Sequence, residues 1–326
     1  MKSVAIGIDI GGTNTKYGLA DENGNILASS SLPTRKEDDF PAYILHLYEA
    51  IESLRKSLDE EVHIKGIGIG APNANYYTGT IEDAPNLIWE GELHIVEEFN
   101  KYYDAPVIVT NDANAAAMGE LIYGGAKEMK NFIMITLGTG VGSGFIVNGD
   151  LVYGHDGFAG ELGHVITEWG GRPCTCGRNG CLETYGAARG VIITVMEELA
   201  GSHETCELRS LSREEITPKA VFEAAEKGDK IALRTFERTG QYLGRALSNM
   251  VNIFSPEAIF LFGGVARAGK YLLEPIEKHM NANVLSIFKD KVKLIRSKLP
   301  ESDAAILGAS SLVWKEFGTP EREVAD

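Results

Sequence analysis

The sequence contains no long hydrophobic run and only four cysteines. No stretch approaches the roughly 18 apolar residues that a membrane span needs, so we expect no membrane-spanning segment. The first residues, MKSVAIGIDIGGT, are too short and too rich in glycine for a signal peptide, and no small-residue cleavage site follows an apolar run. These absences predict a cytoplasmic protein with reduced thiols and argue against a disulfide-stapled scaffold.

Positive charge is also scarce. The chain has 31 lysines and arginines against 46 aspartates and glutamates, which gives a net charge of −15. A surface this acidic repels phosphate backbones. The longest mixed basic stretch, residues 289–293, is better explained as the edge of a strand. We therefore expect no nucleic-acid partner.

The rest of the composition is typical of a soluble globular protein. Hydrophobic residues make up 44% and charged residues 24% of the 326 residues. This length is enough for two domains of ordinary size or for one large α/β unit. Strand-like and helix-like stretches alternate along the chain, which predicts α/β layering.

One pattern occurs twice in the sequence. Residues 4–29 and 131–154 each read as a strand, a Gly-rich loop, a second strand, an Asn-Gly turn and a third strand. Asn-Gly between apolar runs is a strong hairpin signal. A duplication of this kind suggests two related lobes that face each other. The second copy has Thr136 near the place that Asp9 has in the first, so the two loops should have different roles.

Further elements follow from periodicity and capping residues. Residues 40–58 have helical spacing behind a cap from Asp38 or Asp39, with Pro41 near the first turn. The other expected strands are residues 63–72, 105–112, 258–262 and 292–297. The other expected helices begin near residues 113, 182, 217, 229, 270 and 303. Residues 203–216 resemble a polar connection, and 319–326 a frayed tail.

The first Gly-rich loop follows a strand that ends near Asp9. The glycines Gly11 and Gly12 let backbone N–H groups approach an anion closely, and the Thr13 hydroxyl adds a donor. The arrangement suits a nucleotide phosphate, with Asp9 holding Mg²⁺ directly or through water. A tight turn with a solvated aspartate explains the loop alone equally well.

The second Gly-rich loop resembles a phosphate cradle more strongly. Residues 137–144 contain four glycines, which weaken a strand and therefore need a reason. A glycine-kinked hairpin is the alternative. Gly263 and Gly264, at the end of the strand 258–262, would let a third backbone segment approach the nucleotide, or would form an ordinary strand-to-helix turn.

Asn111 and Asp112 lie where an apolar strand ends and a helix starts. Ligands of open α/β sheets bind at the carboxyl ends of strands. A carboxylate at this place can accept a proton from a substrate hydroxyl, as in phosphoryl transfer. The alternative is that Asp112 only caps the helix beginning at Ala113, and the residues alone favour that cap.

Three cysteines and a histidine are crowded into residues 164–181. His164, Cys174, Cys176 and Cys181 form a Cys₃His set, which predicts a closed tetrahedral and therefore structural zinc site. The C-x-C spacing differs from the C-x-x-C of redox pairs, and incidental thiols are the remaining alternative. Glutamates on either side of this set, Glu161 and Glu183, would accept hydrogen bonds from sugar hydroxyls if the zinc holds them in place. Solvated surface glutamates are the alternative.

Together these segments resemble the family of Repressors, Open reading frames and sugar Kinases (ROK), which belongs to the actin-like ATPase superfamily. The most specific stretches are LGTGVGSGFIVNGDLVYGHDGFAGELGH (137–164) and CTCGRNGCLE (174–183). DIGGTNTK (9–16) matches the family's first phosphate loop, and TNDANAAAMGE (110–120) matches its catalytic segment. The resemblance covers essentially the whole chain.

The resemblance implies a two-lobe α/β fold of the actin-like ATPase (ribonuclease H-like) type with a cleft between the lobes. Residues 1–115 and about 303–326 would form the small lobe. Residues 116–302 would form the large lobe, with the zinc-binding segment at 164–181.

The resemblance also implies roles for single residues. Asp112 would be the general base, and His164 would contact sugar through one ring nitrogen and zinc through the other. The implied sugar contacts are Asn111, Asp112, Glu161, His164 and Glu183. The implied nucleotide contacts are Asp9, Gly11, Gly12, Thr13, Asn14, Lys16, Gly138, Thr139, Gly140, Gly263 and Gly264. Asp9 would also hold Mg²⁺.

The chain departs from the family pattern after Ala71-Pro72, where many members continue with glycine. Because the Asn-Ala-Asn-Tyr-Tyr stretch found here lies where members shape the sugar pocket, we expect Asn73 and Asn86 to add sugar contacts. After Glu183 many members have a Tyr-Ala-Ser run, whereas this chain has Thr-Tyr-Gly-Ala. These departures leave the identity of the sugar open.

The implied activity is ATP-dependent phosphorylation of the 6-hydroxyl of glucose, with Mg²⁺ and a structural Zn²⁺, in a homodimer or larger homo-oligomer. N-acetylglucosamine or another N-acetylhexosamine is the alternative substrate. A sugar-responsive repressor of the same family is a second hypothesis. Against it, the first strand begins by Val4, which leaves no room for a helix-turn-helix, and the net charge is −15. A binding-only protein is a third hypothesis. It predicts decay at the base position or in the phosphate loops, and in this sequence both are intact.

Overall fold

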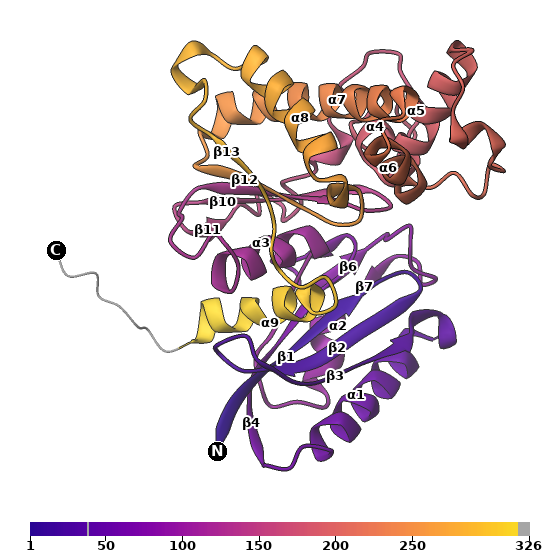
Figure 1. The fold of residues 1–326 in the computed structure, drawn as a ribbon. Coiled ribbons are helices and arrows are strands. Elements are labelled where there is room, and N and C mark those ends of the chain that lie inside the picture. The colour runs from indigo at the N-terminus through magenta and orange to yellow at the C-terminus, as the bar shows by residue number, and fades with distance from the viewer. Residues whose placement is uncertain (38, 319–326) are drawn as a thin grey trace. The chain divides into compact units, whose positions relative to one another are not determined.

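The computed structural model describes residues 1–37 and 39–318, apart from the side chain of Lys36 (Figure 1). The chain forms two compact α/β units. Unit 1 consists of Met1–Met129, Leu151–Ala159 and Lys298–Asp326, and unit 2 of Lys130–Asp150 and Gly160–Ser297. Among the described residues, no helix is long and apolar enough to cross a membrane.

The sheet of unit 1 has five strands in the order β3-β2-β1-β4-β8. These strands are β1 (Lys2–Ile10), β2 (Asn14–Ala20), β3 (Ile26–Pro33), β4 (Val62–Gly70) and β8 (Val107–Thr110). β1 pairs antiparallel with β2 and parallel with β4, and β4 pairs parallel with β8. The carboxyl ends of β1, β4 and β8 therefore lie at one edge of the sheet.

The sheet of unit 2 repeats this topology in the order β11-β10-β9-β12-β13. Its strands are β9 (Phe132–Leu137), β10 (Val141–Val147), β11 (Asp150–Leu151), β12 (Ala258–Phe262) and β13 (Lys293–Arg296). β9 pairs antiparallel with β10 and parallel with β12, and β12 pairs parallel with β13. The repeat predicted for three strands thus extends to all five.

Both predicted Asn-Gly turns are present. Asn148 and Gly149 have φ angles of 54° and 86°, as a two-residue type I′ hairpin turn requires. The third strand of this copy is shorter than predicted and ends at Leu151. Tyr153 lies in the segment Leu151–Ala159, which belongs to unit 1. Its ring stacks on the ring of Tyr76, with the centroids 4.2 Å apart.

The described part of unit 1 contains four α-helices. They are α1 (Phe40–Lys56), α2 (Ile95–Asn100), α3 (Asp112–Ile122) and α9 (Ala304–Phe317). Asp39 caps α1 by accepting a hydrogen bond from the Ala42 N–H, whereas Asp38 lies outside the described residues. Figure 1 shows α9, in yellow, against β1 and beside α3. The predicted lobe boundary at residue 115 lies inside α3, and this helix belongs to unit 1 because it packs on α9.

A small sheet in unit 1 was not predicted, nor was α2. The sheet consists of β5 (Ala74–Asn75), β6 (Thr80–Glu82) and β7 (Glu92–Leu93). Short 3₁₀ helices also occur along the chain. They are η1 (Thr34–Lys36), η2 (Leu162–His164), η3 (Glu207–Ser210), η4 (Val265–Ala268) and η5 (Ser286–Phe288). These pieces are too short for hydrophobic periodicity to reveal.

Unit 2 carries the remaining helices of the described chain. They are α4 (Glu183–Gly186), α5 (Ala188–Gly201), α6 (Pro218–Glu226), α7 (Lys230–Phe254) and α8 (Lys270–Asn283). The helical stretch predicted from residue 182 to 200 is two helices, because Ala187 has an extended backbone with ψ 169°. Thr217 caps α6 and Asp229 caps α7. The predicted tail, 319–326, lies outside the described residues.

Candidate active site

Two carboxylates lie at the carboxyl edge of the unit 1 sheet. Asp9 is near the end of β1, and Asp112 follows β8. Gly70, the last residue of β4, lies beside both: a Cβ atom built on it would be 3.8 Å from Asp9 Oδ1 and 3.6 Å from Asp112 Cα. The three strand ends therefore bring the predicted metal ligand and the predicted base together, at the edge where ligands bind in such sheets.

The cap of α3 is Asn111, not Asp112. Asn111 Oδ1 accepts a hydrogen bond from the Asn114 N–H at 2.7 Å, and Asn111 has the extended backbone of an N-cap residue. Asp112 is the first helical residue, and its Oδ1 accepts a hydrogen bond from the adjacent Ala113 N–H at 2.8 Å. Asp112 is therefore not the cap of the helix, and its carboxylate is available for chemistry.

Both carboxyl groups have raised pKa values. Burial, followed by the nearby Asp112, raises the pKa of Asp9 to about 6, while Lys16 lowers it in part. Asp112 has surface that is accessible to solvent, but many protein atoms surround its carboxylate. The resulting desolvation raises the pKa of Asp112 above the usual value, despite the hydrogen bond from the Ala113 N–H. Two crowded carboxylates of this kind are a suitable place for a cation, and a base with a raised pKa is better matched to neutral pH.

The first Gly-rich loop is held through its carbonyl groups. Thr34 Oγ1 donates to the Gly11 carbonyl at 2.7 Å, and Arg35 Nε donates to the Gly12 carbonyl at 2.8 Å. Thr34 is itself buried and within hydrogen-bond distance of the Thr15 hydroxyl. Thr13 and Asn14, two of the predicted nucleotide contacts, are exposed on this loop. The Asn86 carbonyl packs against Gly12. Hydrogen bonds thus hold the carbonyl groups of the loop, while Thr13 and Asn14 remain exposed.

The two asparagines of the Asn-Ala-Asn stretch have different surroundings. Asn73 has a left-handed backbone with φ 50°, and its Nδ2 donates to the carbonyls of Glu82 and Asp83. Only its Oδ1 is left as a potential sugar contact. Asn75, which the sequence did not single out, is buried and donates to the Asp156 carbonyl at 2.9 Å. It connects the loop after β4 with the segment that precedes Glu161.

Replacing Asp9 with asparagine should stabilise the protein at neutral pH in the absence of nucleotide and metal. The folded pKa of about 6 lies above the unfolded value of 3.8, so the folded state holds the extra proton between these pH values. The free energy of unfolding therefore falls as the pH rises from 3.8 to about 6, and above this range the full cost of the buried carboxylate remains. We expect a gain of up to about 3 kcal/mol at pH 7.5 that shrinks as the pH falls toward 4. Urea unfolding across this range measures it.

Asp21 provides a matched control of opposite sign. Burial alone would raise the pKa of Asp21, but hydrogen bonds from Asn25 and Lys2 outweigh it and lower the pKa below the usual value. Asp21→Asn should therefore destabilise the protein at pH 7.5. An Asp9→Asn variant that is also less stable there would contradict the account of Asp9.

The second Gly-rich loop, residues 137–144, lies in unit 2 and is hydrogen-bonded to Glu183. Glu183 Oε2 accepts a hydrogen bond from the Val141 N–H at 3.0 Å, at the start of β10. A Cβ at position 140 would lie 2.5 Å from this same oxygen, so a larger residue there would displace the Glu183 carboxylate. Gly138, Thr139 and Gly140 form the turn between β9 and β10, and the Gly138 carbonyl accepts from the Ala188 N–H at the start of α5. The predicted nucleotide loop and the predicted sugar ligand are therefore in direct contact.

Glu161 and His164 are positioned by β10. Ser143, a buried residue of β10, donates to the Gly160 carbonyl and accepts from the Leu162 N–H at 3.1 Å. Gly163 packs so closely on β10 that a Cβ would lie 2.0 Å from the Val141 carbonyl oxygen. η2 is therefore fixed on the strand, with Glu161 before it and His164 as its last residue.

The predicted zinc ligands are together. One ligand atom from each of His164, Cys174, Cys176 and Cys181 lies within 4.8 Å of the others. The Sγ atoms of Cys176 and Cys181 are 3.6 Å apart, and Cys174 Sγ is 3.7 Å from His164 Nδ1. Ligands 2.0–2.3 Å from a tetrahedral zinc are about 3.3–3.8 Å apart, so these two distances fit that ion. Because Nδ1 belongs to the cluster, Nε2 of His164 is the nitrogen left for a sugar.

A cavity of about 450 Å³ lies in unit 2 beside the Gly-rich segments. Gly138 and Gly264, both predicted nucleotide contacts, are part of its lining. The sequence did not reveal the rest of the lining, which is mainly apolar. It includes Ala188, Pro218, Phe222, Phe236, Val265 and Ala268. An apolar cavity bordered by glycine backbone suits a nucleotide base with its phosphates at the loops.

The chain is similar in sequence and in structure to known proteins of one family. The sequence profile of the ROK family matches residues 5–316. A glucokinase from Halalkalibacterium halodurans is 36% identical over 323 residues, which are 97% of this chain and 97% of that protein. The crystal structure of a ROK-family glucokinase from Streptomyces griseus in complex with glucose and AMPPNP has a TM-score of 0.78 at 30% identity, covering 95% of this chain and 98% of that one.

A regulatory protein is also similar. A ROK-family transcriptional regulator, a homologue of the E. coli MLC protein, has a TM-score of 0.86 at 26% identity, over 97% of this chain and 78% of that one. The fold alone therefore does not distinguish an enzyme from a regulator, and the residues of the site have to decide.

Proposed function

The chain belongs to the ROK family, and we propose on this premise that it is an ATP-dependent kinase that phosphorylates the 6-hydroxyl of glucose. Its two units have the actin-like ATPase fold that the sequence implied, as in the similar glucokinase structure. One observation carries the enzymatic reading. Asn111 caps α3, so the neighbouring Asp112 carboxylate is not the helix cap and is available as a base.

The proposed chemistry uses the carboxylate of Asp112. As the sugar O6 attacks the γ-phosphorus of ATP, the O6 proton moves to Asp112, and the bond between the γ-phosphorus and the bridging oxygen of ADP breaks. The amide of Asn111 and the carboxylates of Glu161 and Glu183 hydrogen-bond the sugar hydroxyls, and His164 does so through Nε2. Asn73 and Asn86 are further proposed contacts.

The nucleotide and the metals are assigned to residues that suit them. Asp9 would hold Mg²⁺, which when bound neutralises phosphate charge. The backbone of the two Gly-rich loops would hold the phosphates, and the cavity at Phe222 would take the base. The Cys₃His cluster would hold a structural Zn²⁺. The expected homo-oligomer and cytoplasmic location stay predictions.

Replacing Phe222 with alanine should raise KM for ATP about tenfold, because the base loses an apolar contact of roughly 1–2 kcal/mol. kcat and KM for glucose should change little. Phe288 is a matched control, because it is also half-buried in unit 2 but does not line the cavity. Steady-state kinetics of both alanine variants tests the assignment, and equal effects on KM for ATP would refute it.

The substrate is tested by ADP release in a coupled assay with glucose, N-acetylglucosamine, N-acetylmannosamine, mannose and fructose. We expect the highest kcat/KM with glucose. A higher value for N-acetylglucosamine would replace the sugar but keep the reaction. No sugar-dependent ADP release at all would overturn the kinase proposal and favour a binding or regulatory role.

A further inference from the structure

Arg172 makes an unusually complete set of contacts in unit 2. It lies two residues before Cys174, and its side chain is only 11% exposed. Nη1 donates to the carbonyls of Thr184 at 2.9 Å and Gly190 at 3.2 Å, and Nη2 donates to Thr194 Oγ1 at 3.0 Å. Glu197 balances the charge with an oxygen 2.9 Å from Nη2.

These partners lie directly around Glu183. Thr184 is the next residue, and Tyr185 is the one after it. The Arg172 guanidinium lies over the Tyr185 ring at 4.6 Å from its centroid, and the Tyr185 hydroxyl accepts from the Arg172 backbone N–H at 3.0 Å. Arg172 therefore ties the segment before Cys174 to both α4 and α5, through contacts that involve no metal ligand.

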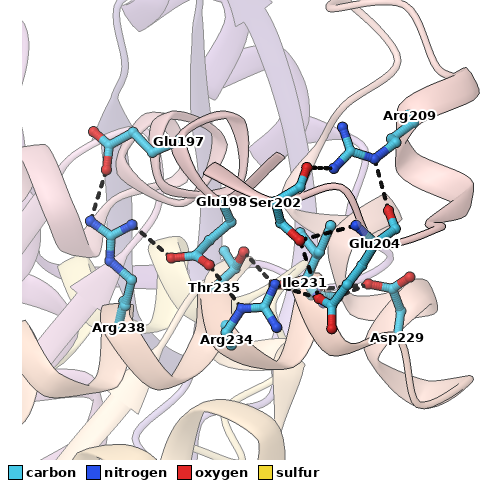
Figure 2. A network of polar contacts seen from close by, with 11 residues as sticks. Glu197, Glu198, Ser202, Glu204, Arg209, Asp229, Ile231, Arg234, Thr235 and Arg238 are labelled. Carbon is cyan, nitrogen blue, oxygen red and sulfur yellow. Dashed lines mark hydrogen bonds and ion pairs between the residues drawn. The ribbon is translucent and has the colours of Figure 1, made fainter. Parts of the chain in front are cut away.

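A second arginine shares one of these partners but not the others. Figure 2 shows the polar network of α5 and α7, in which Arg238 donates to Glu197 and Glu198. Arg234 continues the network to Glu198 and Glu204. No hydrogen bond from the Arg238 side chain to α4 or to the segment before Cys174 is found among the described residues. A substitution of Arg238 therefore removes an ion pair on Glu197 without removing the hydrogen bonds that hold α4.

We propose that Arg172 is a positioning residue for sugar binding, which fixes α4 so that the Glu183 carboxylate stays beside the second Gly-rich loop. This inference rests on the proposed function, in which Glu183 binds the sugar. Only arginine presents a planar fork that can reach two carbonyls, a hydroxyl and a carboxylate at once. Lysine keeps the charge but offers one point of donation, so it should not replace arginine here.

The test compares Arg172→Met and Arg172→Lys with Arg238→Met. Both Arg172 variants should raise KM for glucose at least tenfold. Their kcat and KM for ATP should stay within about threefold of the wild type, because Asp112 and the cavity keep their surroundings. Arg238→Met should keep the wild-type KM for glucose. Bound zinc and melting temperature, measured on the same samples, show whether the cluster and the fold are retained.

The outcomes separate this inference from the function on which it rests. A wild-type KM for glucose in Arg172→Lys overturns the positioning role, whatever Arg172→Met does. An equal rise in KM for Arg172→Met and Arg238→Met also overturns it, because the ion pairs on Glu197 would then explain both. If the wild type and Arg238→Met do not phosphorylate glucose, the proposed function fails and the inference fails with it.

Discussion

Asp112→Asn should lower kcat by roughly 10²–10⁴-fold while the protein stays folded and still binds glucose. The amide that replaces the carboxylate cannot accept the O6 proton. It can still accept the hydrogen bond from the Ala113 N–H, and the cap of α3 is unaffected because it comes from Asn111. Steady-state kinetics measures the loss of turnover, and titration calorimetry measures glucose binding.

Asp39→Asn is the matched control for this change. Asp39 caps α1 in the same unit, and asparagine is an equally good cap, so activity and stability should be nearly unchanged. If Asp112 only supported the start of a helix, its replacement would be equally mild. An Asp112→Asn variant with near-normal kcat would therefore reject Asp112 as the base.

Cys181→Ser should remove the bound zinc and abolish most of the activity. Cys181 is fully buried, and its backbone forms a bridge with Ile166 that closes the segment. Structural zinc contributes on the order of 10 kcal/mol to the folding of small zinc domains, so its loss should unfold this loop-rich segment locally. Because His164 is both a proposed zinc ligand and the last residue of η2, we expect kcat/KM for glucose to fall at least about 100-fold, as losses of several kcal/mol imply.

The fourth cysteine provides the control for the zinc experiment. Cys206 is buried but stands outside the cluster. Cys206→Ser should keep one zinc per chain, measured by plasma emission spectrometry, and nearly full activity. Wild-type protein without zinc, or a Cys181→Ser variant with normal zinc and normal kcat/KM, would contradict the structural role of the metal.

Signals confined to one segment were readable from the sequence. The turns at Asn23-Gly24 and Asn148-Gly149 predicted the two hairpins, because only residues that tolerate positive φ suit such turns. The spacing of His164 and the three cysteines predicted the cluster found in the structure. Thr217-Pro218 predicted the start of α6, since Thr217 caps the helix and proline suits its first turn.

Properties that depend on a single position or on distant segments were not readable. Asparagine and aspartate are both good helix caps, so the pair Asn111-Asp112 could not show which one caps α3. The cavity lining comes from the β9–β10 turn, the start of α5, and α6, α7 and η4, which no local pattern connects. Arg172 resembled any polar loop residue, because its partners in α4 and α5 are set by tertiary packing.

The most direct test of the central claim is to identify the product made from glucose and ATP. The reaction is run with an excess of a dehydrogenase specific for glucose 6-phosphate, and NADPH formation is compared with ADP release. The account predicts that the two are equal for the wild type and that both are lost in Asp112→Asn. Release of ADP without matching NADPH, or NADPH formation by Asp112→Asn at the wild-type rate, would contradict it.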